Sequence, residues 1–427
     1  MARSGYALLW WLATPFILLR LAWRSRRQRG YLEHLGERFG SYAAVEPVPR
    51  IWIHAVSVGE TRAAAVLVDA LAELYPRHRI LVTHMTPTGR ATGVALFGDR
   101  VERAWLPYDH GFATRRFLAH YRPEFGVILE TELWPRLLEE ARRAAVPVFL
   151  ANARLSERSA RRYARFPRLT RWALSNLSGI AAQSSADAAR FAALGASAPE
   201  VTGNIKFDLD VPAEMIGRGA DFRNRFGAGR RICVVGSTRD GEEALLLDAL
   251  AAAQVAPEVL FVIVPRHPQR FDEVAALAAA RGLEVARRSA AAAIAPRVRV
   301  VIGDSMGEML AYYAAADVVV MGGSLLDYGS QNLIEACAVG KPVIVGPSTH
   351  NFEEASKSAI AAGAALRVRD ARAAVEEAIG LLGDDVRRAS MGAAALEFAR
   401  SNRGAVARLA SWLERRLAPV GGQPRGR

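Results

Sequence analysis

Glu60 has the clearest position in this chain for acid–base chemistry. It follows Ile51–Ala55, which alternates like a short buried strand, and Ser57–Gly59, a loop of small residues. A long helix rich in alanine, leucine and valine begins at the same point, and such a strand–loop–helix unit presents ligands at the carboxyl end of a parallel strand. Because the helix dipole favours a charged carboxylate in the first turn, we expect Glu60 to be ionised and able to act as a base. A glutamate that only stabilises the helix would fit the same position.

Two more carboxylates stand at the end of another predicted strand. The segment ETELWP contains Glu130 and Glu132, and strand alternation turns their side chains to different faces, so we do not expect an acid–base pair. Lys206, in GNIKFD, is expected to face the same region. Asp208 and Asp210 form a D-x-D, which binds a divalent metal in other sugar transferases. Here it lies in a predicted linker, and we expect no metal.

The second half of the chain carries groups suited to binding a phosphate. Four loops follow predicted strands there, namely GSTRDGEE, VPRHPQR, GDSMGEM and GGSLLDYGSQNLIEA. They offer glycines, helix N-termini and the cations Arg239, Arg266 and His267, which together predict a phosphate site that needs no P-loop. The sequence contains neither GxxxxGK[ST] nor a GxGxxG that opens a helix. Asn332 and Glu335 share one face at the start of a helix, where Glu335 could bind ribose hydroxyls.

Composition limits the classes of function. The chain has 427 residues, a formal net charge of +13 and 51% hydrophobic residues, which is typical of a globular protein of two or three domains. The positive charge favours an anionic partner: nucleic acid, an acidic membrane surface or a phosphorylated substrate. Aromatic residues do not alternate with basic ones as a base-stacking surface requires, which disfavours nucleic acid. The two cysteines form no Cys/His cluster, which argues against a structural zinc site.

An apolar segment near the start of the chain predicts a membrane anchor over residues 1–28. Tyr6–Trp23 is mostly apolar, is interrupted by Pro15 and Arg20, and is followed by an arginine cluster. We expect either a short span or a helix lying in the membrane interface, with the rest of the chain on the cytoplasmic side of the inner membrane. A cleaved signal peptide fits poorly, because no small-residue cleavage site follows. A buried core helix is the remaining alternative.

The remaining elements must position these groups. From Ile51 onward, apolar runs alternate with helical patterns, first six and then, from Arg231, five more. Apolar runs between helices predict parallel sheets that are covered on both faces. We therefore predict an α/β fold of two Rossmann-like, doubly wound domains that face a cleft, over residues 29–210 and 211–418. The linker is expected within 203–219, and 419–427 is expected to be a disordered tail.

The ordered motifs of this chain resemble those of bacterial 3-deoxy-D-manno-octulosonic acid (Kdo) transferases over nearly its full length. They occur in family order and read AVSVGE, THMTPTG, LPYD, ETELWP, NARLS, GNIKFD, VPRHP, GDSMGE, GGSL and N-x-x-E. The resemblance implies a GT-B glycosyltransferase with an acceptor domain followed by a CMP-Kdo domain. Such enzymes transfer Kdo from CMP-Kdo, with inversion, to the 6′-hydroxyl of a tetra-acylated, bis-phosphorylated lipid A precursor in lipopolysaccharide biosynthesis. No cofactor or metal is implied.

The same resemblance assigns roles to individual residues. It implies that Glu60 is the general base and that Glu130 is a second essential carboxylate. The residues it implies for the CMP-Kdo site are Arg266, His267, Met306, Gly307, Glu308, Asn332, Leu333, Ile334 and Glu335, and we expect Lys206 to join them at the departing phosphate. One departure concerns the family's frequent Gly-Gly-His-Asn before the N-x-x-E helix. This chain has Gln331 in place of that histidine, and an amide cannot titrate as an imidazole does.

Two alternatives come from other classes. A nucleotide-sugar epimerase shares the two-domain fold, would need no anchor and would convert a soluble nucleotide sugar without lipid; a transferase with another acceptor is a variant of the first hypothesis. A basic membrane-surface scaffold without catalysis is the other. A scaffold would keep its function when Glu60 is replaced by glutamine, whereas a transferase would lose activity by about 10²–10⁴-fold.

Overall fold

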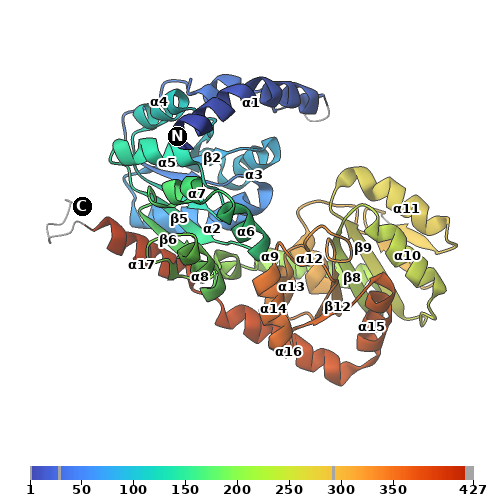
Figure 1. The fold of residues 1–427 in the computed structure, drawn as a ribbon. Helices are drawn as coiled ribbons and strands as arrows, with labels where there is room; N and C mark the ends of the chain where they lie inside the picture. Colours follow the sequence, from blue (N-terminus) through green and yellow to red (C-terminus); the bar gives the residue numbers. More distant parts are fainter. Residues whose placement is uncertain (1, 27–29, 291–293, 419–427) are drawn as a thin grey trace. The chain divides into compact units, whose positions relative to one another are not determined.

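The protein, described here from a computed structural model, consists of two compact units. The structure describes residues 2–26, 30–290 and 294–418. Unit 1 contains the chain up to Asp208 together with the stretch from Gly404, and unit 2 is Leu209–Arg403. Each unit is built around one seven-stranded parallel sheet with helices on its faces (Figure 1). The predicted α/β class with two doubly wound parallel sheets is therefore confirmed, while the cleft between the halves stays a prediction.

Unit 1 has strand order β3-β2-β1-β4-β5-β6-β7. Its strands are β1 Arg50–His54, β2 Arg79–His84, β3 Val101–Trp105, β4 Pro123–Leu129, β5 Val148–Ala153, β6 Gly179–Ala182 and β7 Glu200–Val201. Its helices are α1 Ala2–Ser25, η1 Leu35–Phe39, α2 Val58–Leu74, α3 Pro87–Phe97, η2 Gly98–Arg100, α4 Gly111–Tyr121, α5 Pro135–Arg143, α6 Glu157–Ala164, α7 Pro167–Leu174, α8 Ser185–Ala193, η3 Ile205–Asp208 and α17 Ala405–Leu417.

Unit 2 has strand order β10-β11-β9-β8-β12-β13-β14. Its strands are β8 Arg231–Thr238, β9 Val259–Pro265, β10 Val285–Arg287, β11 Val300–Ile302, β12 Val318–Met321, β13 Val343–Val345 and β14 Ala365–Arg367. Its helices are α9 Ala213–Gly227, α10 Glu242–Ala252, η4 Pro268–Arg270, α11 Phe271–Ala279, α12 Met309–Ala315, α13 Leu333–Ala338, α14 Glu353–Ala361, α15 Ala371–Gly383 and α16 Asp385–Ser401.

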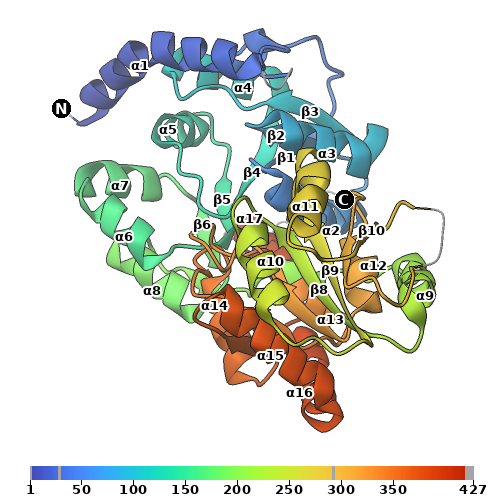
Figure 2. The same ribbon diagram turned by 90° about the vertical axis from the view of Figure 1, so that its right-hand side faces the viewer.

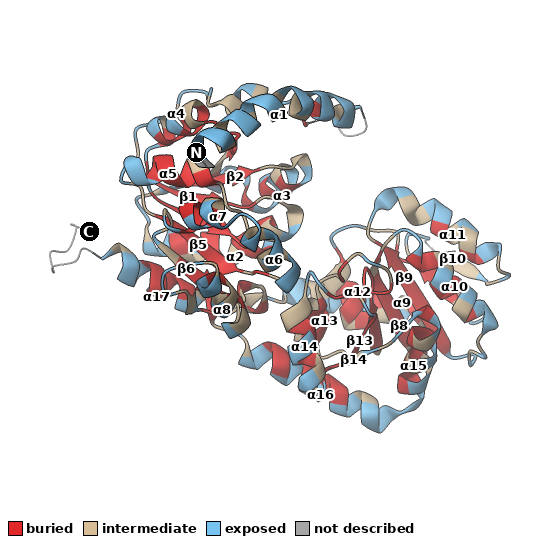
Figure 3. Cartoon of the chain, viewed as in Figure 1, coloured by how far each residue is buried: buried red, intermediate tan, exposed pale blue. Residues whose placement is uncertain are grey.

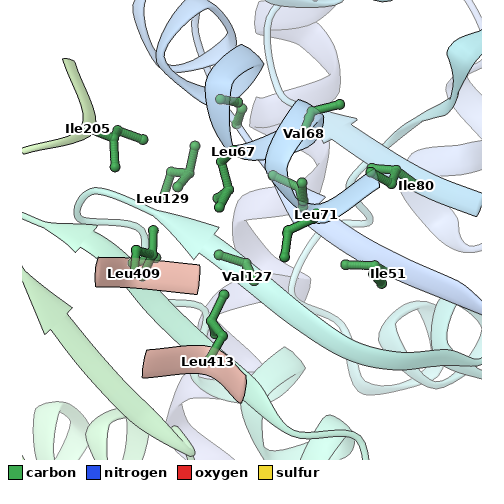
Figure 4. Packing of buried hydrophobic residues seen from close by; sticks show 14 of the residues in the cluster. Ile51, Leu67, Val68, Leu71, Ile80, Val127, Leu129, Ile205, Leu409 and Leu413 are labelled. Carbon is green, nitrogen blue, oxygen red and sulfur yellow. The ribbon is translucent and has the colours of Figure 1, made fainter. Parts of the chain in front are cut away.

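Burial on both faces of each sheet explains why the strands read as apolar runs. In β1, Ile51 and Ile53 belong to the core on one face, whereas Trp52 belongs to the core on the other. Leu67 of α2 packs on the first of these faces (Figure 4). Figure 3 shows the same pattern in both units, with buried strands and helices that expose their outer sides. Each fully buried leucine or isoleucine contributes about 1.5–3 kcal/mol relative to exposure.

The end of the chain departs from the predicted domain boundary. Residues 404–418 were expected to complete the second domain, but α17 belongs to unit 1 (red in Figure 1). Trp412 of α17 lies edge-on to Phe149 of β5, with ring centroids 5.4 Å apart. The carboxylate of Asp208 accepts hydrogen bonds from the backbone N–H groups of Gly404 and Val406 and so caps α17. An apolar stripe shows that a helix packs, but not on which sheet, and the boundary at 418 was wrong for this reason.

Helix α1 lies lengthwise along unit 1 (Figure 2). The Tyr6 hydroxyl donates to Asp109 Oδ2 at 2.7 Å, and Thr14 Oγ1 lies 2.8 Å from His110 Nε2. Farther along the helix, Leu21 is buried in a small core. The opposite face is apolar and exposed, with Leu8, Leu9, Trp11, Leu12, Phe16, Leu19 and Trp23. By length and composition Arg3–Ser25 is long and apolar enough to cross a membrane, and only 6% of its most apolar window is buried.

Candidate active site

Glu60 lies in the first turn of α2, directly after β1 and its short loop. Ser57 caps the helix, and Glu60 returns the interaction. Its Oε2 accepts a hydrogen bond from the backbone N–H of Val56 at 2.7 Å, and its Oε1 accepts one from the Ser57 hydroxyl at 3.1 Å. The carboxyl group is therefore held in one orientation at the carboxyl end of the sheet. Helix capping and a chemical role are compatible here, because each oxygen keeps a further lone pair.

The charge state of Glu60 differs from the expectation. Burial, followed by the neighbouring Glu130 carboxylate, raises the pKa of Glu60 to about 8, although the hydrogen bonds from Val56 and Ser57 act in the opposite direction. The prediction that Glu60 is ionised at neutral pH was wrong. The helix dipole contributes little to a group that burial and like charge both disfavour in its ionised form. A carboxyl group with this pKa is, however, a stronger base once it has lost its proton.

Glu130 is the buried carboxylate whose negative charge raises the pKa of Glu60. It follows β4 with a left-handed backbone conformation, φ 62°, which is uncommon for a residue with a side chain. Its Oε1 lies 2.6 Å from Lys206 Nζ, and Arg154 lies 4.0 Å from its Oε2. Burial alone would raise the pKa of Glu130, but Lys206 and Arg154 bring it below its usual value. The pKa values of the two carboxyl groups are thus driven apart, so that Glu130 favours the charged form and Glu60 favours the protonated form.

Three further residues, Lys206, Arg154 and Glu132, surround this pair, and only Arg154 was not singled out from the sequence. Lys206 was expected to face the region of Glu130, and this is confirmed by its place in η3 beside that carboxylate; its contact with the donor phosphate stays a prediction. Arg154 was quoted only within the motif NARLS, although its place directly after β5 was a usable signal. Burial first, and then Glu130, raise the pKa of Glu132 as well, so three carboxyl groups influence one another here.

In unit 2, Glu242 organises the loops that were predicted to bind phosphate. This fully buried carboxylate accepts backbone hydrogen bonds from Arg239 at 2.8 Å, from Gly323 at 2.6 Å and from Leu325 at 2.9 Å. It thereby joins the loop after β8 to the loop after β12. Glu242 was not among the residues singled out from the sequence. The only signal in the sequence was a pair of glutamates after a turn that contains glycine. A hydrogen-bond partner such as the N–H of Gly323 lies 81 residues farther along the chain.

The loops after β8 and β9 bring several cations around His267. Burial, followed by Arg239, Arg266 and Arg270, lowers the pKa of His267, so the imidazole lies in a positive field. The guanidinium of Arg239 stacks over the Tyr328 ring at 4.8 Å. The backbone N–H of Arg266 donates to the Thr238 carbonyl at 3.0 Å, which fixes the start of its loop beside β8. Such a positive field favours an anion, and the phosphate site expected from the loop sequences stays a prediction.

In the predicted turn Met306-Gly307-Glu308, the carboxylate is held by two arginines of the same unit. Glu308 is buried and accepts hydrogen bonds from Arg218 at 2.7 Å and Arg288 at 2.6 Å. Gly307 has φ 82°, a left-handed conformation that favours glycine, and Met306 is 51% exposed. Within this turn the exposed methionine and the backbone are thus the groups open to a ligand.

The N-x-x-E segment opens α13 as predicted. Asn332 Oδ1 accepts from the backbone N–H of Ile334 at 3.2 Å, and its Nδ2 donates to Glu335 Oε1 at 3.0 Å, so the shared face is confirmed. Leu333 and Ile334 are fully buried, which leaves only their backbone for a ligand. The backbone N–H of Gln331 donates to the Gly322 carbonyl at 3.0 Å, which ties this segment to the loop after β12.

Comparison with known proteins identifies the family. Residues 33–209 match the model described as 3-deoxy-D-manno-octulosonic-acid transferase (kdotransferase), and residues 244–398 match glycosyl transferases group 1. The chain is 45% identical to the 3-deoxy-D-manno-octulosonic acid transferase of Bordetella pertussis, over 97% of this chain and 99% of that one. It belongs to the Kdo transferase family. The enzyme of that name from Haemophilus influenzae is 36% identical, over 97% and 98% of the two chains.

This Kdo transferase also shares its fold with more distant proteins. UDP-GlcNAc 2-epimerase from Neisseria meningitidis, solved with UDP-GlcNAc, aligns with a TM-score of 0.60 at 15% identity, over 86% of this chain and all of that one. Anabaena HepE, solved with UDP and glucose, gives 0.57 at 16% identity, over 86% and 98%. At such identities the likeness concerns the fold alone, which is GT-B-like. The family resemblance expected from the motifs is thus confirmed, and the chain is a glycosyltransferase.

Proposed function

We propose that this Kdo transferase takes Kdo from CMP-Kdo and attaches it, with inversion, to the 6′-hydroxyl of a tetra-acylated, bis-phosphorylated lipid A precursor. The observation that carries the proposal is the Glu60–Glu130 pair. The two carboxyl groups stand where parallel strands end, within the segment that matches the Kdo transferase family, and their charge states are split by Lys206. A carboxyl pair whose pKa values are driven apart is the arrangement that assigns one member as a base.

In the proposed step, ionised Glu60 removes the proton from the acceptor hydroxyl. The acceptor oxygen forms a bond to the anomeric carbon of Kdo while the bond from that carbon to the phosphate oxygen breaks, and CMP leaves. Charged Glu130 increases the basicity of Glu60, and Lys206 keeps Glu130 charged. The pKa of Glu60, near the pH of the cytoplasm, matches a base that must gain and lose a proton in each cycle.

The donor would bind to unit 2. Arg239, Arg266 and the N–H groups of the loops joined by Glu242 stabilise the phosphate of CMP, whose negative charge rises from one in the diester to two as CMP departs. Glu335, held by Asn332, accepts hydrogen bonds from the ribose hydroxyls. Neither role requires a metal ion, because fixed cations supply the positive potential.

Helix α1 would hold the enzyme at the cytoplasmic face of the inner membrane, in the interface rather than across the bilayer. Its contacts with unit 1 extend from Arg3, paired with Glu139 at 2.9 Å, to buried Leu21. These eighteen steps along the helix correspond to roughly 27 Å, nearly the thickness of the hydrocarbon core. A spanning α1 would lose all of these contacts. An in-plane α1 keeps them and immerses its exposed apolar face.

A product assay tests the function. The purified enzyme is incubated with the lipid A precursor and with CMP-Kdo generated in situ, and the mass of the lipid product is measured by mass spectrometry. We expect a mass gain of whole Kdo units that requires the lipid and falls by about 10²–10⁴-fold in Glu60→Gln. Release of CMP at the same rate without lipid would contradict the acceptor, and an absence of CMP release would contradict the donor.

A further inference from the structure

Helices α6 and α7 form a strongly basic surface element, here called the arginine hairpin, residues 157–174. It contains six exposed arginines, Arg158, Arg161, Arg162, Arg165, Arg168 and Arg171. Among the described residues, only Arg161 of these six forms an ion pair, with Glu157 at 3.4 Å. Neither the fold nor the proposed chemistry at Glu60 uses these charges.

The positions of the arginines make one charged face. Arg158 and Arg162 lie in α6 and Arg165 directly follows it with a helical backbone, so these arginines, four and three residues apart, project from the same side. Helix α6 has no buried residue, and like charges at this spacing destabilise an isolated helix. Phe166, at the corner between the two helices, is 62% exposed. An anion from outside the protein would neutralise the arginine face, and an apolar phase beside it would bury the exposed Phe166 ring.

The hairpin adjoins the apolar helix α1. The ring of Trp172 in α7 lies edge-on to Tyr6 of α1, with centroids 5.8 Å apart, and the guanidinium of Arg3 lies 5.5 Å from the centre of the same ring. Figure 2 shows α7 on the side of unit 1 where α1 begins. Unit 1 thus presents an apolar helix face and a cationic face next to each other, which is the pattern of an element that lies on an anionic membrane.

We propose that the arginine hairpin binds the phosphate headgroups of an anionic bilayer and that Phe166 enters the headgroup region beside α1. The hairpin is then a second membrane contact, independent of α1, and orients unit 1 on the lipid surface. The inference rests on the proposed membrane location but not on the proposed acceptor. It follows the chemistry of arginine, whose guanidinium forms paired hydrogen bonds with phosphate oxygens.

The test compares two full-length triple variants with the same change in net charge. Arg158→Gln/Arg162→Gln/Arg165→Gln removes the charged face of α6. The matched control is Arg297→Gln/Arg369→Gln/Arg372→Gln, which removes three exposed arginines of unit 2. Binding to vesicles of phosphatidylglycerol and phosphatidylcholine, and of phosphatidylcholine alone, is measured by flotation at low and high salt without donor or acceptor. Each arginine near an anionic surface contributes roughly fivefold, so the hairpin variant should partition roughly 100-fold less onto anionic vesicles.

We expect this loss to shrink at high salt and to be absent on neutral vesicles, and we expect the control to bind like the wild type. Equal loss in both variants would overturn the proposal, because net charge alone would then explain binding. So would wild-type binding by the hairpin variant. Activity is then compared between vesicle-embedded and detergent-dispersed acceptor, and we expect the ratio to fall in the hairpin variant. An equal fall with both acceptor forms would instead assign the arginines to the acceptor itself and contradict a bilayer contact.

Discussion

Replacing Glu60 by glutamine should make the protein more stable at alkaline pH while it abolishes most activity. Glutamine has nearly the same shape, and its carbonyl oxygen can still accept the hydrogen bond from the Val56 N–H, 2.7 Å away in the native structure. It carries no charge, so the burial and the Glu130 repulsion that disfavour ionised Glu60 disappear. A residue that costs stability and raises activity is expected at a catalytic position.

The size of the effect follows from the pKa of Glu60, which the fold raises from 4.5 to about 8. Between these values the folded protein binds one more proton than the unfolded chain, so the free energy of unfolding falls as pH rises. Each pKa unit corresponds to about 1.36 kcal/mol. From about pH 5.5 to about pH 8.5 the wild type should therefore lose roughly 3 kcal/mol relative to Glu60→Gln, with the loss complete once Glu60 is fully ionised.

The assay is urea unfolding of both proteins at the two pH values, with far-UV circular dichroism as the readout. Glu73→Gln, which removes an exposed carboxylate from the same helix, is the control and should show no such pH-dependent difference from the wild type. The same difference in stability between wild type and Glu60→Gln at both pH values would contradict this prediction, because Glu60 would then have the same pKa in the folded and unfolded states.

Three further predictions concern other positions. Lys206→Met should destabilise unit 1 by about 3–5 kcal/mol in urea unfolding and lower kcat/KM, since it leaves the buried Glu130 without its nearest cation; Lys206→Arg should restore much of both, and an unchanged stability would contradict the ion pair. Glu242→Gln should raise the KM for the donor by about tenfold or more, with a smaller effect on kcat, because a neutral amide offers one acceptor oxygen to several N–H groups. An unchanged donor KM would be inconsistent with the role of Glu242 in joining the two loops. Trp412→Ala should cost about 3–5 kcal/mol in unfolding of unit 1, and a negligible loss would argue against the packing of α17 there.

The two parallel sheets could be predicted because burial on both faces leaves continuous apolar runs in the sequence. The short strands β7, β10 and β14 were not predicted, since two or three residues at the edge of a sheet carry too little pattern. The place of α17 was also missed. Its capping by Asp208 depends on a contact between residues 196 positions apart, which no local pattern encodes.

For the candidate site, the sequence pointed to Glu60, Glu130 and the shared face of Asn332 and Glu335, but it did not predict their electrostatics. The ionisation of Glu60 depends on burial and on the distance to Glu130, and both arise only from the fold. The same limit applies to Glu242, whose partners lie in a different loop. Spacing along the chain can thus identify candidate groups, whereas their charge states follow from three-dimensional neighbours.

The pH dependence of kcat/KM for the wild type and for Glu130→Gln decides whether Glu60 is a base tuned by Glu130, because this ratio reports the ionisation of the free enzyme. We predict that wild-type kcat/KM rises with pH through a midpoint near 8, the pKa of Glu60. Glu130→Gln removes the carboxylate that raises this pKa, so its residual activity should rise through a lower midpoint. A wild-type profile that is flat across neutral and mildly alkaline pH, or a midpoint that Glu130→Gln leaves in place, would contradict Glu60 as the base that Glu130 tunes.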